Sequence, residues 1–169
     1  MTDGPPAEAP SRHEEAVELR KEAYTMALYV AICLLAALLA VPEDAAHTRV
    51  TGLIWGVTVG LAAAHWFAFR VSARLVGAGT VRSPDVRLAG AQLLGAVAVA
   101  LLASVPVVLL PRSIELGVTT VWLAAFIALA GFAVARAGGA TRPRASIYAL
   151  SVLVIGIAIA ELKNVLVGH

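Results

Sequence analysis

Two ionisable side chains, His65 and Glu161, stand out because they lie in or at the end of long apolar segments. An ionisable group inside a membrane is costly, so such groups commonly serve proton relays, ion sites or ligand sites. Each also has a structural interpretation. His65 is followed by Trp66 and Arg70, which are typical of the membrane interface, so its ring can instead reach toward lipid headgroups. Glu161 is intramembrane only if the membrane extends beyond Ala160, and otherwise it belongs to a solvated helix end.

Other polar residues share helix faces with these two. Thr51, Thr58 and His65 are spaced seven apart, which places them on one stripe of a helix. Asn164 follows Glu161 by three residues and shares its face. We therefore define a candidate intramembrane polar site as Thr51, Thr58, His65, Glu161 and Asn164. Its chemistry would be proton or small-ion passage, with a polar path near His65 and a gate or charge site at Glu161.

The opposite face of the same helix carries a stripe of small residues. Its members are each four residues apart: Gly52, Gly56, Gly60 and Ala64. Such stripes let helix backbones approach closely in lipid, where no hydrophobic force drives helices together. The stripe predicts helix packing, either within the chain, which is the preferred interpretation, or against another copy. A helix constrained on both faces is expected to be an inner helix of its bundle.

The elements that would position these residues are apolar helices. The chain is 60% hydrophobic and 14% charged, with mean hydropathy +0.85, whereas about 25% charged residues is usual in soluble domains. A membrane span needs about 20 mostly apolar residues. Five segments approach or meet that length: 24–41, 50–69, 88–110, 116–135 and 145–167. Prolines fall between them, at Pro42, Pro84, Pro111 and Pro143. The prediction is an all-α polytopic membrane bundle of five transmembrane helices.

The first residues differ from the rest. Residues 1–10 contain three prolines and no aromatic residue, which is typical of a disordered tail. Ser11 and Glu14 have the spacing of a capping box, so residues 11–23 are expected to form a charged helix that leads into the first span. Residues 24–169 would then form the five-helix transmembrane domain.

The basic residues predict an orientation, because positively charged loops stay in the cytoplasm. Of the 13 Lys and Arg residues, five spans place ten on the side of the N-terminus and three on the other. The ten are Arg12, Arg20, Lys21, Arg70, Arg74, Arg82, Arg87, Arg136, Arg142 and Arg144, and the three are Arg49, Arg112 and Lys163. The expected protein has a cytoplasmic N-terminus and an outward C-terminus in the inner (plasma) membrane.

Several function classes lack their motifs. The sequence has no phosphate-binding loop, dinucleotide fingerprint or nucleophile elbow, so no enzyme and no cofactor are expected. Cys33 is the single cysteine, and Glu43, Asp44 and His47 lack a recognised metal-site spacing, so no metal site is expected. The arginines are dispersed through short loops, which does not favour nucleic-acid binding.

The composition and two short segments of the sequence are similar to those of a group of bacterial membrane proteins. The chain is rich in alanine, valine and arginine and has two lysines. Together with the segments Tyr24–Val30 and Leu162–His169, it resembles uncharacterised small multi-pass membrane proteins of high-GC actinobacteria. This resemblance implies a membrane fold and no particular activity. The leading hypothesis is a non-enzymatic membrane protein that self-associates or acts as an accessory subunit of a membrane complex. The alternative is a small oligomeric channel or transporter for protons or small ions.

Overall fold

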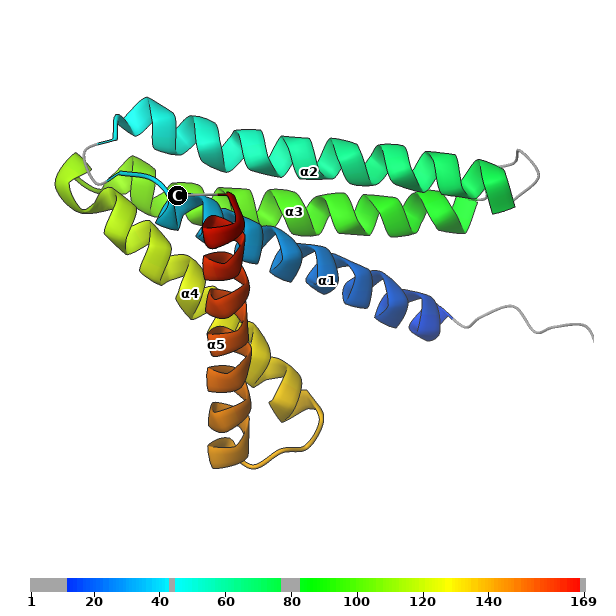
Figure 1. Ribbon diagram of the computed structural model, residues 1–169. Coiled ribbons are helices and arrows are strands. Elements are labelled where there is room, and N and C mark those ends of the chain that lie inside the picture. The colour runs from blue at the N-terminus through cyan, green and yellow to red at the C-terminus, as the bar shows by residue number, and fades with distance from the viewer. Residues whose placement is uncertain (1–11, 43–44, 77–82, 168–169) are drawn as a thin grey trace, which may run out of the picture.

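The computed structural model describes residues 12–42, 45–76 and 83–167, and these form five α-helices without any strand (Figure 1). The helices are α1 (Arg12–Leu39), α2 (His47–Val76), α3 (Ser83–Leu109), α4 (Arg112–Ala137) and α5 (Arg142–Val167). Each is long and apolar enough to cross a membrane. The prediction of an all-α fold with five such helices is confirmed. The proposed tail and Ser11 lie outside the described residues.

The central helix is α1, which contacts each of the other four helices. Its charged first turns and its apolar part form one continuous helix. The share of buried residues along the span is 44% in α1 and 11% in α2. The expectation that the second helix is an inner one is therefore wrong. Most of its length is exposed, and α2 packs mainly on α3 and one side of α1.

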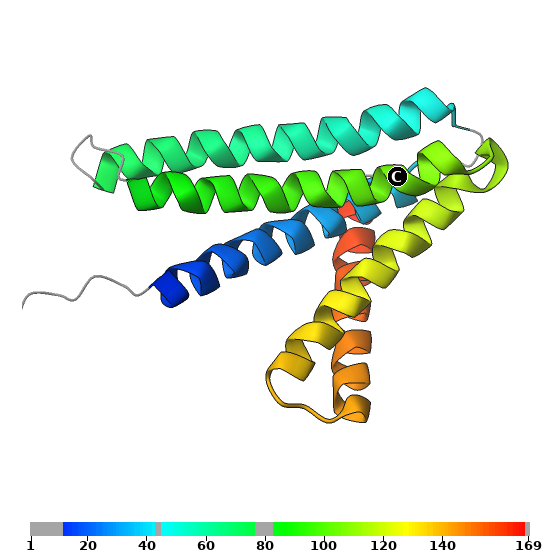
Figure 2. The same ribbon diagram turned by 180° about the vertical axis from the view of Figure 1, so that it is seen from behind.

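The five helices meet at one end of the molecule and diverge at the other. Figures 1 and 2 show α2 and α3 side by side, with α1 crossing beneath them and the α4–α5 hairpin leaving at a steep angle. The ends of α1, α3 and α5 gather with the starts of α2 and α4. We call this the convergent end. The opposite helix ends form two separate groups, which we call the diverging ends.

Glycines lie at two close contacts between helices. A Cβ added at Gly95 of α3 would collide with the backbone oxygen of Ala23 in α1 and lie 3.0 Å from its carbonyl carbon. A Cβ added at Gly131 of α4 would lie 3.1 Å from Cβ of Val152 and 3.3 Å from Cα of Ala149 in α5. The absence of a side chain therefore lets α1 approach α3 and α4 approach α5, which maximises van der Waals contact in lipid.

The core lies between α1, α3, α4 and the first turns of α2, near the convergent end. Its large members are fully buried leucine, isoleucine and valine side chains: Val30, Leu34, Leu35, Leu38, Ile54, Val99, Leu123 and Ile127. The buried face of α4 repeats every four residues through Glu115, Thr119, Leu123, Ile127 and Gly131. Small residues of α5 are buried as well, namely Ala145, Ala149, Gly156 and Ala160. This packing leaves most of α2 outside the core.

Candidate functional site

The small-residue stripe of α2 points away from the protein. Gly52, Gly56, Gly60 and Ala64 are all exposed, and a Cβ added at any of the three glycines would meet no atom within 4 Å in the described chain. The packed face of α2, with Val50, Ile54 and Thr58, lies on the opposite side of the helix. The interpretation that the stripe packs within the chain is therefore wrong. Packing against another chain stays a prediction.

The two threonines of the predicted polar stripe face inward. Thr58 is 2% exposed, and its hydroxyl donates a hydrogen bond to the backbone oxygen of Ile54 at 2.8 Å. The hydroxyl oxygen of Thr51 is buried and has no hydrogen-bond partner within the described part of the chain. Thr58 thus satisfies its hydroxyl in its own helix, while Thr51 leaves a polar atom unmatched near the convergent end.

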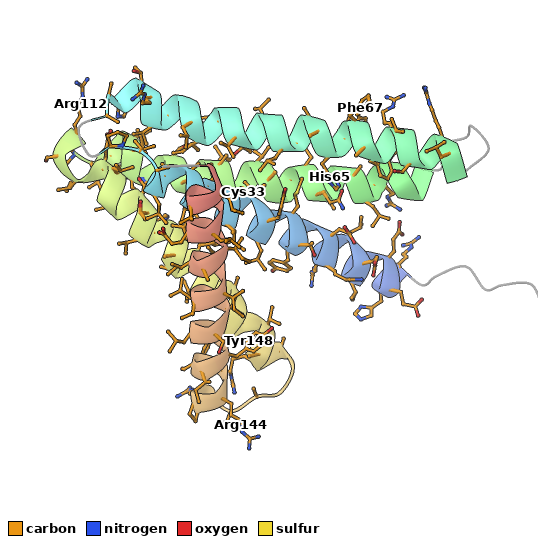
Figure 3. The ribbon with its side chains drawn as sticks, viewed as in Figure 1. Cys33, His65, Phe67, Arg112, Arg144 and Tyr148 are labelled. Atoms are coloured by element: carbon orange, nitrogen blue, oxygen red, sulfur yellow. The ribbon has the colours of Figure 1, made fainter. Side chains whose placement is uncertain are left out.

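His65 belongs to a chain of hydrogen bonds that joins three helices. Its Nε2 donates to Oε1 of Gln92 in α3 at 2.5 Å, and Nε2 of Gln92 donates to Oε2 of Glu22 in α1 at 2.5 Å. Figure 3 shows His65 between α2 and α3. We call Glu22, Gln92 and His65 the polar chain. Because each member comes from a different helix, the polar chain ties α1, α2 and α3 together near their diverging ends.

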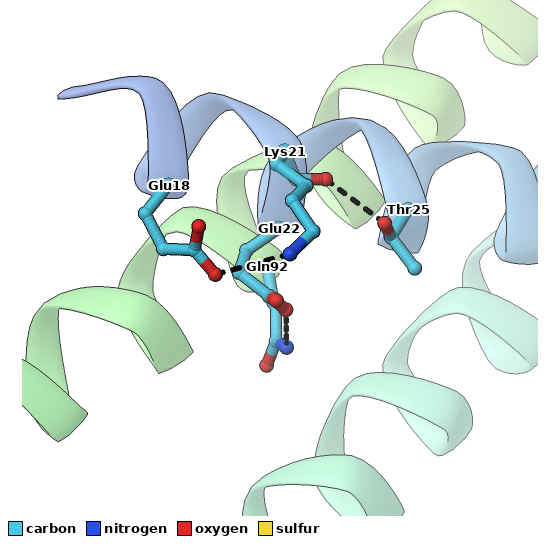
Figure 4. A network of polar contacts seen from close by, with 5 residues as sticks. All are labelled: Glu18, Lys21, Glu22, Thr25 and Gln92. Carbon is cyan, nitrogen blue, oxygen red and sulfur yellow. Dashed lines mark hydrogen bonds and ion pairs between the residues drawn. The ribbon is translucent and has the colours of Figure 1, made fainter. Parts of the chain in front are cut away.

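Further polar contacts surround the polar chain on α1 (Figure 4). Lys21 pairs with Glu18 at 3.2 Å, and the Thr25 hydroxyl donates to the backbone oxygen of Lys21 at 2.9 Å. Closer to the start of α1, Glu15 forms an ion pair with Arg87 of α3. These contacts are mostly exposed, and exposed ion pairs each contribute little to stability. Their main effect is to orient the polar start of α1 against α3.

Glu161 does not join His65. It is exposed on the last turns of α5, which end at the convergent end, whereas the polar chain lies toward the diverging ends (Figures 1 and 3). No ion pair of Glu161 occurs within residues 12–42, 45–76 and 83–167. Asn164 lies in α5, but its side chain falls outside the described residues. The candidate polar site is therefore divided: His65 lies toward the diverging ends, whereas Glu161 lies at the convergent end.

The buried carboxylate of this fold is Glu115, which sequence reasoning missed. Glu115 is 2% exposed in the first turn of α4, and its Oε2 accepts a hydrogen bond from Nδ1 of His47 at 2.7 Å. His47 begins α2 and has a side chain 35% exposed. One turn later, the Thr119 hydroxyl donates to the backbone oxygen of Glu115 at 2.6 Å. The positive end of the α4 dipole also favours a carboxylate there.

The sequence carried one signal for this pair. Glu115 and Thr119 stand four apart and continue the same spacing through Leu123, Ile127 and Gly131. That repeat identifies one helix face, although an acidic residue in a first turn is equally typical of an exposed helix start. The burial of Glu115 depends on α2 beginning beside it, which no local pattern indicates.

A cavity of about 310 Å³ lies among α1, α2 and α3. Its walls are almost entirely apolar side chains and include Trp55, Trp66 and Leu93, while His65 and Thr58 are its polar residues. Arg70 does not line the cavity, but its guanidinium lies 5.8 Å from the ring centre of Trp66, which does, and this is a cation–π distance. The site therefore combines a hydrocarbon-like interior with a cation beside it.

The described residues hold no group of three or more His, Cys, Asp or Glu side chains able to bind a metal. Comparison of the chain with known protein families, with curated proteins and with solved structures finds no match. The arrangement offers three separate features: an outward small-residue stripe, the polar chain beside an apolar cavity, and a buried carboxylate–imidazole pair.

Proposed function

We propose that this chain is a non-enzymatic multi-pass protein of the inner (plasma) membrane that self-associates or joins a larger membrane complex through α2. One observation carries the proposal. The small-residue stripe lies exposed on the least buried of the five helices, and its three glycines leave open space. The lipid bilayer would be its solvent, and another membrane helix would be its partner.

The physical argument is the cost of leaving such a stripe unpacked. A row of glycines weakens helix propensity by about 1 kcal/mol each relative to alanine, so it needs a compensating gain. In lipid that gain comes from close backbone contact between helices. Close contact at a glycine already occurs inside this chain, where Gly95 lies against α1 and Gly131 lies against α5. A second helix seated along Gly52, Gly56 and Gly60 would use it again.

The proposed orientation places the N-terminus in the cytoplasm and the C-terminus outside. Its support is the distribution of arginines. Arg70, Arg74, Arg136 and Arg144 lie at the diverging ends, as Figure 3 shows for Arg144, whereas Arg112 lies at the convergent end. The positive-inside rule then assigns the diverging ends to the cytoplasm.

Gly56→Leu tests the assembly. The large side chain would hold a partner helix away from α2, and its Cβ would meet no atom of the described chain within 4 Å. Gly117→Leu is the matched control, because Gly117 is also exposed in a helix with no atom near its Cβ position. Oligomer size in lipid nanodiscs should fall for Gly56→Leu and stay unchanged for Gly117→Leu. Identical oligomer distributions and co-purifying partners for all three proteins would contradict the proposal.

A second candidate function is a small oligomeric channel or transporter for protons or small ions. The polar chain favours it, because His65 and Glu22 are titratable groups of the kind that proton pathways use, and Gln92 joins them by hydrogen bonds. Gln92→Leu interrupts the chain between His65 and Glu22. Proton flux into liposomes that falls to background in this variant would support the second candidate, and background flux for the unmodified protein would exclude it.

A further inference from the structure

The apolar cavity opens toward the side of the bundle. Its floor includes Met26 and Ala89, which are 5% and 4% exposed, while its rim includes Val59, Trp66 and Leu93, which are 60%, 42% and 49% exposed. These residues belong to helices that are apolar enough to cross a membrane. In a single copy whose α1, α2 and α3 span a bilayer, the opening therefore faces lipid.

Hydrocarbon suits this cavity better than water does. A buried water needs about two to four polar partners. The lining offers the Thr58 hydroxyl, which is already bonded to Ile54, and the His65 ring, whose Nε2 is bonded to Gln92. The volume of about 310 Å³ is at the lower end of the range for small-molecule sites, roughly 300–1,000 Å³. A segment of an acyl chain from the surrounding lipid fits both the volume and the chemistry.

A cation lies beside Trp66, one of the residues that line the cavity. Arg70 lies one turn beyond Trp66, and its guanidinium rests over that ring. The basic members of the three ion pairs among the described residues are Lys21, His47 and Arg87. Arg70 belongs to none of these three pairs. Arginine binds phosphate oxygens well because its planar fork donates two parallel hydrogen bonds. Arg70 thus complements an anionic headgroup, and the apolar interior of the cavity complements an acyl chain.

We propose that this cavity is a binding site for an anionic phospholipid, with one acyl chain among α1, α2 and α3 and the phosphate against Arg70. The polar chain supports the site by fixing the His65 ring in the wall, since Gln92 holds its Nε2. The site does not depend on self-association, because all of its elements belong to one copy of the chain.

The first test is lipid selectivity. Full-length protein is delipidated in detergent, and native mass spectrometry measures its adducts with dioleoyl phosphatidylglycerol and with dioleoyl phosphatidylcholine, which carry the same chains. The anionic lipid should bind about fivefold more tightly, the ratio expected for one basic residue near an anionic group. Arg70→Gln should remove this preference. Arg144→Gln, an exposed arginine on α5, should retain it. Equal affinity for both lipids in the unmodified protein would overturn the headgroup assignment.

The second test fills the cavity. Ala62 lines it, so Ala62→Phe should eliminate the first phosphatidylglycerol adduct, whereas Ala125→Phe, at an exposed position of α4, should not. The thermal midpoint of each lipid-stripped variant reports folding, and Ala63→Leu replaces Ala62→Phe if the latter does not fold. An adduct that survives filling would overturn the proposal. The proposal would also be overturned if the Ala62→Phe protein kept its lipid adduct but no longer formed oligomers. That result would mean that the cavity receives a side chain of a second copy.

Discussion

The substitution Gly95→Ala tests whether backbone contact between α1 and α3 holds the bundle together. The added methyl group would collide with the backbone oxygen of Ala23 and lie 3.0 Å from its carbonyl carbon. A backbone atom in mid-helix cannot rotate away as a side chain can. We therefore expect α1 and α3 to separate locally, with loss of contacts on both sides of the crossing.

The magnitude follows from two opposing terms. Replacing a helical glycine by alanine stabilises the helix by about 1 kcal/mol. Overpacking costs about 1–3 kcal/mol, and contact with rigid backbone favours the upper value. Gly95→Ala should therefore lower the free energy of unfolding by about 2 kcal/mol. Gly56→Ala has only the favourable term, because its Cβ would meet no atom within 4 Å, and should raise stability by up to about 1 kcal/mol.

The free energy of unfolding of both variants can be measured by titration with sodium dodecyl sulfate in mixed micelles. Circular dichroism follows the loss of helix, at a protein concentration that keeps the chain monomeric. Gly131→Ala should lie between them, since its nearest contact, at 3.1 Å, is the side chain of Val152, although Cα of Ala149 follows at 3.3 Å. The reasoning is refuted if Gly95→Ala is as stable as Gly56→Ala. That result would mean that α1 can move aside at no cost and that the glycine contact does not determine the packing.

Three further predictions concern the two ends of the bundle. His47→Ala leaves the buried Glu115 carboxylate without its partner, so it should lower the free energy of unfolding at neutral pH by about 2 kcal/mol. The double variant His47→Ala, Glu115→Leu should recover part of that loss, and denaturant titration measures both. In a cysteine-free background, Thr48→Cys should react with an impermeant maleimide in intact cells and Thr141→Cys should not; the reverse pattern would invert the proposed orientation. Glu161→Gln should change the unfolding free energy by less than about 0.5 kcal/mol because Glu161 is exposed, and a larger loss would show that its carboxylate has a partner.

Part of the candidate site could be predicted from the sequence. The seven-residue and four-residue spacings correctly predict that Thr58 and the glycines lie on opposite faces of one helix, but they do not show which face points outward. The partners of His65 did not follow, because Gln92 and Glu22 come from two other helices and have no fixed sequence relation to it. The burial of Glu115 did not follow from the sequence for the same reason. Burial of a carboxylate depends on which helix end lies beside it.

The order of apolar segments along the sequence determined the number of helices and their approximate limits. A bilayer requires long apolar runs and leaves the helix as the only way to satisfy backbone groups in such runs. The choice of α1 as the central helix, the close contacts at Gly95 and Gly131, and the outward stripe of α2 were decided only by tertiary structure. In a soluble helix the polar face marks the outside, but a membrane helix is apolar on its lipid face and on its packed face alike. Hydropathy therefore identifies the spans and does not distinguish their sides, so the inner face of each helix emerges only when all five are assembled.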